Sequence, residues 1–172
     1  MPNPYISGTG FYLPPHVVIN DDLSKYMDTT DEWIQERTGI KERHYVEKGV
    51  GSSDLAIPAT EQALVKAGLQ VSDIELIIFA TSTPDFYAPG AGCLLQEKMG
   101  FNEIGALDIR VQCSGFIYGM SIAEQYIKTG TFKNILLIGA EVQSTAMDLT
   151  DSGRDTAVIF GDGAGAVIIS AT

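Results

Sequence analysis

Two short, almost wholly apolar segments place the strongest limit on how this chain can fold. Residues 74–80 read Ile-Glu-Leu-Ile-Ile-Phe-Ala, and residues 134–140 read Asn-Ile-Leu-Leu-Ile-Gly-Ala. Apolar runs of this length are typical of strands that are buried on both faces of a parallel sheet. Segments 54–67, 92–99 and 114–128 repeat apolar residues at helical spacing and flank these runs. Strands that alternate with helices predict an α/β fold with a largely parallel sheet.

The other elements are predicted from caps, breakers and turns. Asn20 is expected to cap a helix through about residue 27, and Thr29 with Glu32 matches a capping box for a helix over 30–38. Pro58 fits its predicted helix only near the start, because proline lacks the N–H that a helix interior uses. Further strands are predicted at 5–10, 106–111, 157–160 and 164–170, the last two joined by a hairpin-like turn at 161–163.

The composition is that of a globular protein and limits the partners it can have. The chain has 172 residues, of which 45% are hydrophobic and 19% charged, and this fits a single domain over 1–172. Its net charge of −11 argues against general nucleic-acid binding, which needs a basic face. No apolar run approaches the roughly 18 residues of a membrane helix, and the first residues lack a signal-peptide pattern. We therefore expect a cytoplasmic protein that binds neither nucleic acid nor membrane.

The cysteines and histidines are too few and too scattered to suggest a metal site. Cys93, Cys113, His16 and His44 are the only residues of these two types, and no pair of them has zinc-site spacing. We expect no metal, and in a cytoplasmic protein we expect both cysteines to be reduced.

Cys113 is the candidate nucleophile, because it follows a predicted strand and opens a predicted helix. Backbone N–H groups at a helix N-terminus stabilise an anion, which favours the reactive thiolate. Gly115 and Gly119 share one helical face and would let this helix approach another element closely. From position alone, a buried and inert cysteine is the more common outcome and stays open.

Three blocks of sequence resemble β-ketoacyl-[acyl-carrier-protein] synthase III. They are residues 28–43 (DTTDEWIQERTGIKER), 112–130 (QCSGFIYGMSIAEQYIKTG) and 160–166 (FGDGAGA), and they occur in the family's order. The resemblance covers essentially all of residues 4–172. It implies the N-terminal half of a thiolase-like fold, with a mixed five-stranded sheet and helices on both faces, in a homodimer. It also implies that the C-terminal half of the fold is absent from this chain.

By this resemblance, Cys113 accepts an acyl group from acyl-CoA, which is a substrate, so that no cofactor is expected. Malonyl-acyl-carrier protein then loses carbon dioxide, and its enolate attacks the acyl-cysteine in a decarboxylative Claisen condensation that starts fatty-acid synthesis. The backbone N–H of Cys113 would supply part of an oxyanion hole. The family's catalytic His and Asn lie in the second half of its fold, and complete activity would need that half. His16 and His44 are expected to be structural or solvated.

Trp33 and Arg37 are the first candidate CoA-binding residues. They are four positions apart in a predicted helix and therefore share a face, where an indole and a guanidinium could stack on a purine. A core tryptophan beside a surface arginine explains the pattern alone equally simply. The resemblance implies that both residues hold the CoA adenine and that Arg154 lies on the other side of the base. Thr29 is a candidate partner of the adenine, although a capping role would explain it as well.

Ala88 bears on the length of the acyl group. It falls where short-primer members of the family often carry a bulky aromatic residue, so we expect a roomier acyl pocket and a primer longer than acetyl. Phe86 or Tyr87 could fill this space through a shifted loop. Lys41 and Arg43 are candidates for docking an acidic carrier protein.

Several alternatives stay open at this point. Hydroxymethylglutaryl-CoA synthase is the least favoured of them, because it carries a glutamate after the strand at 76–80, where this sequence has Thr-Ser-Thr. Condensing enzymes that prime polyketides or join long acyl chains share nearly all the quoted motifs. A half-length subunit that is inactive without a partner supplying His and Asn is a further possibility, as is a truncated or proteolysed enzyme. Dimerisation is expected through residues 76–99 and 108–112.

Overall fold

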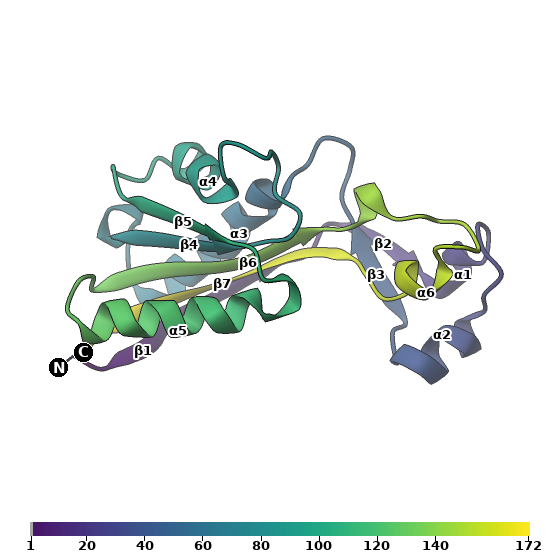
Figure 1. Ribbon diagram of the computed structural model, residues 1–172, viewed down its shortest axis with the longest axis horizontal. Helices are drawn as coiled ribbons and strands as arrows, with labels where there is room; N and C mark the ends of the chain where they lie inside the picture. The colour runs from purple at the N-terminus through teal and green to yellow at the C-terminus, as the bar shows by residue number, and fades with distance from the viewer. Residues whose placement is uncertain (1) are drawn as a thin grey trace.

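A mixed five-stranded sheet forms the centre of the molecule in the computed structural model, which describes residues 2–172 (Figure 1). The strand order is β1-β7-β6-β4-β5, in which β4 runs parallel to β5 and β6 while β7 is antiparallel to both of its neighbours. The mixed five-stranded sheet that the resemblance implied is confirmed, whereas the largely parallel sheet expected from the alternating pattern is wrong, since two of the four strand pairs are antiparallel. Its strands are β1 (Pro4–Tyr12), β4 (Leu76–Ala80), β5 (Gly105–Ile109), β6 (Asn134–Val142) and β7 (Asp162–Ala171).

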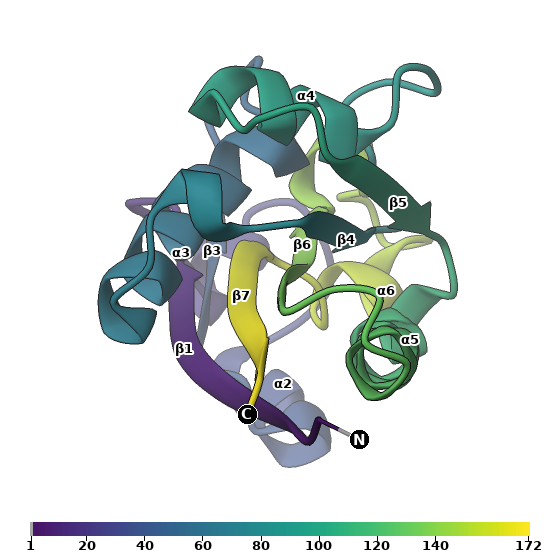
Figure 2. The same cartoon turned by 90° about the vertical axis from the view of Figure 1, so that its left-hand side faces the viewer.

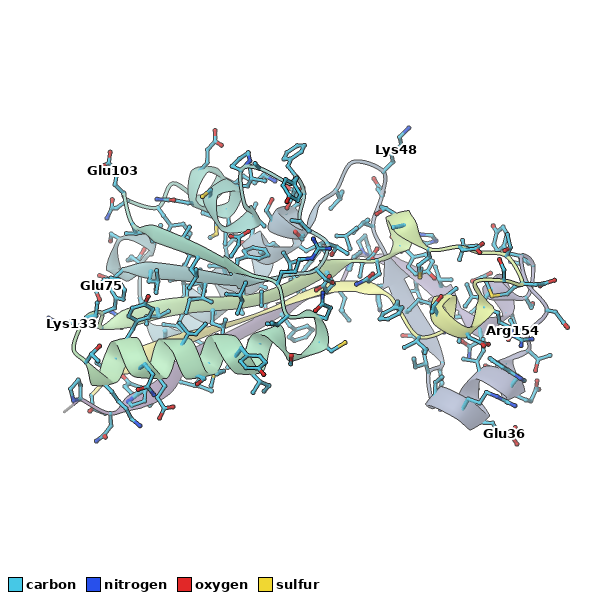
Figure 3. The ribbon with its side chains drawn as sticks, viewed as in Figure 1. Glu36, Lys48, Glu75, Glu103, Lys133 and Arg154 are labelled. Atoms are coloured by element: carbon cyan, nitrogen blue, oxygen red, sulfur yellow. The ribbon has the colours of Figure 1, made fainter. Side chains whose placement is uncertain are left out.

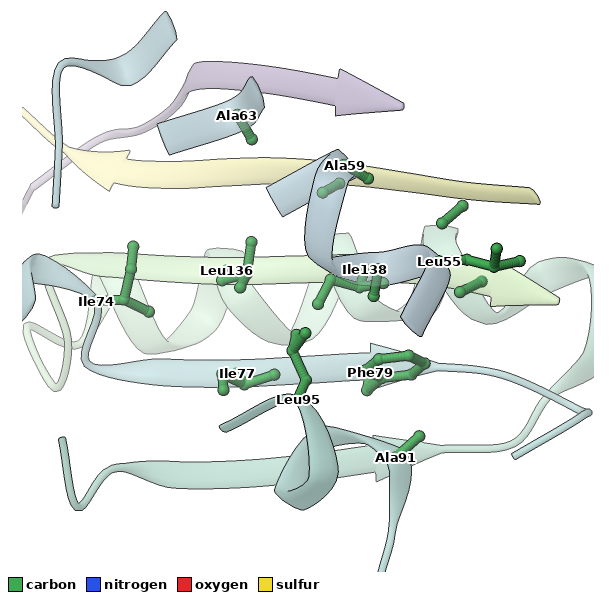
Figure 4. Close-up of a cluster of buried hydrophobic side chains, with 14 of the residues drawn as sticks. Leu55, Ala59, Ala63, Ile74, Ile77, Phe79, Ala91, Leu95, Leu136 and Ile138 are labelled. Carbon is green, nitrogen blue, oxygen red and sulfur yellow. The ribbon is translucent and has the colours of Figure 1, made fainter. Parts of the chain in front are cut away.

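Helices cover both faces of this sheet, as expected from the alternating pattern (Figure 2). Helices α3 (Ser52–Ala67) and α4 (Ala91–Met99) lie on one face, and α5 (Gly115–Lys128) lies on the other. The larger core lies between the sheet and α3 and α4, where apolar side chains of β4 and β6 meet those of the two helices (Figure 4). The two predicted apolar runs thus pack on both faces, because alternate residues of each strand enter opposite cores.

Helix α3 lies unusually close to β1. A Cβ atom on Gly8 would lie 2.1 Å from the backbone oxygen of Ala63, and one on Gly10 would lie 2.0 Å from that of Ala59. Only glycine on the strand and alanine on the helix allow this approach. None of the helices described in residues 2–172 has both the length and the apolar character needed to cross a membrane.

A smaller substructure extends from the C-terminal end of the parallel strands (Figure 1). It contains the two-stranded ribbon of β2 (His16–Ile19) and β3 (Glu42–Tyr45) together with the short helices α1 (Asn20–Leu23), α2 (Asp31–Thr38) and α6 (Arg154–Ala157). Its own apolar cluster brings α1, α2 and α6 together around Leu23, Ile34 and Ala157. Three single 3₁₀ turns complete the structure, at Val71–Asp73, Gln112–Ser114 and Ser144–Ala146.

Some predicted boundaries are wrong. Residues 157–160 do not form a strand, because Ala157 ends α6 and both Ala157 and Val158 pack into the small cluster with Ile34. The predicted hairpin-like turn at 161–163 is wrong as well, since β7 already begins at Asp162. Helix α1 ends at Leu23, well before residue 27. The ribbon of β2 and β3 was not predicted, since its strands are four residues each and one of them is largely polar.

The capping assignments also change. Thr30, not Thr29, is the N-cap of α2, and its hydroxyl accepts a hydrogen bond from the Trp33 N–H at 3.1 Å. Asn20 is the first residue of α1 and not its cap. Helix α3 starts two residues before the predicted position, so Pro58 lies in its second turn.

Candidate functional site

Cys113 lies in the middle of the 3₁₀ turn Gln112–Ser114, between the end of β5 and the start of α5. Its side chain is exposed. The residue before it, Gln112, has φ 47°, and no other non-glycine residue in the described part of the chain has a positive φ. Such a conformation is strained for a side-chain-bearing residue and persists where the surrounding structure holds it, most often at functional sites. The expected strand-to-helix position of Cys113 is therefore confirmed, and the inert buried alternative is wrong about its burial.

Two glycines of α5 bring this turn close to the sheet. A Cβ on Gly115 would lie 3.1 Å from the Cβ of Ala80, the last residue of β4. A Cβ on Gly119 would lie 2.4 Å from a methyl group of Leu137 in β6. The predicted close approach of this helix is confirmed, and it fixes the thiol at the carboxyl ends of the parallel strands, where α/β proteins place their ligands.

Glu141 is the penultimate residue of β6, and its side chain fixes the loop that follows β4. Its carboxylate accepts hydrogen bonds from the N–H and hydroxyl of Ser82 at 2.8 and 2.9 Å and from the hydroxyl of Thr83 at 2.6 Å. The hydroxyl of Thr83 in turn accepts from the Val142 N–H at 2.8 Å. This network joins the ends of two neighbouring strands, and sequence analysis missed it because its members are 58 or 59 residues apart.

Asp85 and Asp108 hold the rest of the same loop. The Asp85 carboxylate accepts from the hydroxyls of Ser52 and Ser53 at 2.9 and 2.7 Å, at the start of α3. The Asp108 carboxylate accepts from the N–H groups of Ala91 and Gly92 at the start of α4, at 2.6 and 2.9 Å. The loop 81–90 is thus anchored at both ends and in its middle.

Ala88 lies at the exposed tip of this anchored loop, next to Phe86 and Tyr87, and Tyr87 is 99% exposed. The Ala88–Pro89 peptide bond is cis. A hollow of about 270 Å³ beside the loop is lined by Phe86 and Tyr87 but not by Ala88. The role of Ala88 in an acyl pocket stays a prediction, because Ala88 is exposed and does not line the hollow beside the loop.

Trp33, Arg37 and Arg154 form a second site in the small substructure, which we call the Trp33 clamp. The guanidinium carbon of Arg37 lies 4.3 Å from the centroid of the Trp33 ring, and that of Arg154 lies 4.6 Å from it. Arg154 also donates from Nη1 to the carbonyl oxygen of Asp28 at 2.9 Å. Figure 3 shows Arg154 beside α2 at the end of the molecule. The structure thus brings together three residues that sequence reasoning grouped from positions up to 121 apart (33 to 154).

Thr29, unlike the adjacent Thr30, has a hydroxyl that makes no hydrogen bond within residues 2–172. Thr29 is only 8% exposed, and this hydroxyl is buried. Because Thr30 provides the helix cap, the capping explanation for Thr29 no longer holds. A buried hydroxyl without a partner is unfavourable by about 1–3 kcal/mol, so a bound group that pairs with it would relieve that cost.

Other candidate residues have structural roles. The Nδ1–H of His44 donates to the carbonyl oxygen of Pro14 at 2.5 Å, and His16 packs edge-on against Tyr45. Arg43 is only 5% exposed, so it cannot serve as the carrier-protein contact that the sequence suggested. Lys41 is exposed. Within residues 2–172, no three His, Cys, Asp or Glu side chains are grouped so that they could hold a metal ion.

The strand order, the helix layers and a cysteine at a strained strand-to-helix turn define the N-terminal half of a thiolase-like fold. Residues 107–172 match the family model described as 3-oxoacyl-[acyl-carrier-protein] synthase III. The chain is 48% identical over 166 residues to β-ketoacyl-[acyl-carrier-protein] synthase III of Xanthomonas euvesicatoria, an alignment that covers 96% of this chain and 50% of the relative. The chain thus matches the N-terminal half of this family in both sequence and fold.

Solved structures agree with this assignment. The 3-oxoacyl-[acyl-carrier-protein] synthase III of Aquifex aeolicus superposes with a TM-score of 0.93 at 45% identity, over 100% of this chain and 54% of the other. The priming β-ketosynthase of the R1128 polyketide pathway superposes with a TM-score of 0.93 at 29% identity, over 99% of this chain and 50% of the other. The chain therefore spans about half the length of the relatives it matches.

Proposed function

We propose that this chain carries the acyl-accepting half of a β-ketoacyl-[acyl-carrier-protein] synthase III, an acyltransferase. The Cys113 thiolate would attack the carbonyl carbon of an acyl-CoA, and the CoA thiolate would leave as the acyl-cysteine thioester forms. The observation that carries this proposal is the exposed Cys113 thiol on its strained turn at the start of α5. The backbone N–H of Cys113 is the candidate donor to the oxyanion that forms during the attack.

The Trp33 clamp supports acyl-CoA as the acyl donor. Its two guanidinium groups and its indole offer flat surfaces on which an adenine can stack. The hydroxyl of Thr29, buried and without a partner, lies four residues before Trp33 in the same substructure and could pair with a nitrogen of the base. These residues fit the adenine end of the substrate, while Cys113 fits its thioester end.

The second step of the proposed reaction, the condensation, would need proton-handling residues from outside this chain. In it, malonyl-acyl-carrier protein loses carbon dioxide, and the resulting enolate attacks the acyl-cysteine. His16 and His44 are engaged with Tyr45 and Pro14. We propose that the proton-handling residues belong to polypeptide corresponding to the other half of the relatives, and that the complete enzyme is a homodimer that joins through the regions 76–99 and 108–112.

A polyketide-priming condensing enzyme is the second candidate. The likeness to the R1128 priming ketosynthase favours it, although the 48% identity to fatty-acid-type relatives is higher. Ala88 at the loop tip is compatible with a primer longer than acetyl in either case.

Mass spectrometry tests the proposed acyl transfer. We expect incubation with octanoyl-CoA or acetyl-CoA to add one acyl group to the peptide containing Cys113, with octanoyl-CoA the faster donor because of Ala88. A Cys93→Ala variant is the matched control and should be acylated as wild type. An adduct that persists in Cys113→Ala would contradict the assignment, and a clear preference for acetyl-CoA would contradict only the role of Ala88.

A further inference from the structure

Arg43 is a buried cation that the proposed reaction does not use. It lies on β3, is 5% exposed, and its hydrogen-bond acceptors within residues 2–172 are all neutral. Burial lowers the pKa of Arg43, because the guanidinium loses its hydration. Its Nε–H also has no partner among these residues. A buried charge held this way is unfavourable in itself, so its presence calls for another explanation.

The acceptors of Arg43 connect it to α6. Its Nη2 donates to the carbonyl oxygen of Val158 at 3.2 Å, and its Nη1 donates to that of Val18 at 3.3 Å. Val158 immediately follows α6, the four-residue helix that begins with Arg154. The guanidinium of Arg43 thus fixes the end of the segment that carries one side of the Trp33 clamp.

The same guanidinium is connected to α2 through Asn20. Nη2 of Arg43 donates to Oδ1 of Asn20 at 2.7 Å. The Nδ2 of Asn20 then donates to Oδ1 of Asp31 and to the carbonyl oxygen of Ile40, both at 2.8 Å. Asp31 begins α2 and Ile40 follows its C-cap, so Asn20 holds both ends of the helix that carries Trp33.

We infer that Arg43 is the positioning residue of the Trp33 clamp, and that through Asn20 it sets the separation between Trp33 on α2 and Arg154 on α6. The identity of the clamped ligand rests on the proposed function, but the link between the two helices consists of the chain's own hydrogen bonds. The planar guanidinium reaches three acceptors in fixed directions, which a lysine ammonium on a flexible stem cannot do. Because Arg43 is buried, it acts through this geometry and not through contact with the ligand.

Trp33 provides the readout, because it is the single tryptophan of the chain. We compare acrylamide quenching of its fluorescence, without ligand, in wild type, Arg43→Lys and Asn20→Asp. Asn20→Asp keeps the acceptor for Arg43 but removes the donor to Asp31 and Ile40. We expect the quenching constant to rise about twofold in both variants, as Trp33 loses the cover of Arg154. Lys48→Met is the control, since Lys48 is exposed on a loop away from the clamp (Figure 3).

CoA titration followed by the same fluorescence is the second measurement. We expect the dissociation constant for CoA to rise roughly tenfold in each single variant, and by no more in the double variant, because both changes break one chain of contacts. Unchanged quenching and unchanged affinity in both variants would overturn the inference. If wild type does not bind CoA, the proposed ligand is wrong, while the quenching result still decides the role of Arg43. If a melting curve shows Arg43→Lys to be unfolded, Asn20→Asp decides alone.

Discussion

At the scale of single residues, the site is defined by positions whose surroundings depart from the ordinary. Within residues 2–172, Gln112 has a strained backbone, Thr29 has a buried hydroxyl without a hydrogen-bond partner, and Arg43 is a buried cation with neutral acceptors. The sequence could identify Cys113 and Trp33 through motifs, but it assigned the cap to the wrong threonine. Adjacent threonines before a helix offer two equivalent caps, and only the backbone geometry selects between them.

The adjacent threonines make a matched pair of variants. We expect Thr30→Val to lower the free energy of unfolding by about 1 kcal/mol through the lost cap, with CoA affinity little affected. Thr29→Val should not lower stability, since its hydroxyl has no partner to lose, and should weaken CoA binding. Thermal melting and CoA titration measure both effects, and the reverse pattern would assign the cap and the ligand contact the other way round.

At the scale of elements, the apolar strands and helices were predictable and the small substructure was not. Runs such as 74–80 and 134–140 are long and apolar enough to give β4 and β6 with shifts of only a few residues at their ends. The ribbon of β2 and β3 pairs residues that are 23 to 29 positions apart, and each strand has four residues, so no local periodicity indicates it. Of the apolar run 157–160, Ala157 and Val158 pack into the cluster with Ile34 of α2, whereas Ile159 and Phe160 are exposed, so the run resembles a strand only in the sequence.

A glycine of helix α5 allows a direct test of how closely this helix packs against β6, and a glycine of β7 provides the control. Gly119→Ala should lower the free energy of unfolding by about 1 kcal/mol, because its new Cβ would lie 2.4 Å from a methyl group of Leu137, which is fully buried and has little room to move, and this cost exceeds the helix-propensity gain of alanine over glycine. Gly165→Ala is the matched control, since a Cβ there has no atom within 4 Å and the backbone has no positive φ. Chemical denaturation of both variants measures the difference, and equal stabilities would show that α5 does not approach the sheet as closely as described.

At the scale of the whole molecule, two sites lie on two parts of the chain. The thiol is fixed by α5 at the carboxyl ends of the parallel strands, while the Trp33 clamp belongs to the small substructure (Figure 1). Asp162 joins these parts, since its carboxylate at the start of β7 accepts hydrogen bonds from the Ser144 and Val46 N–H groups at 2.8 and 2.7 Å. This division into two sites suits the proposed acyl-CoA substrate, which has a nucleotide at one end and a thioester at the other.

The most direct measurement compares two donors of the same acyl group. We predict that octanoyl-CoA acylates Cys113 roughly tenfold faster at limiting concentration than octanoyl-pantetheine, which lacks the adenine nucleotide. In Trp33→Ala this advantage should disappear, while the rate with octanoyl-pantetheine stays as in wild type. Equal rates with both donors in the wild-type protein would contradict the claim that one chain joins an acyl-accepting thiol to a CoA-binding clamp.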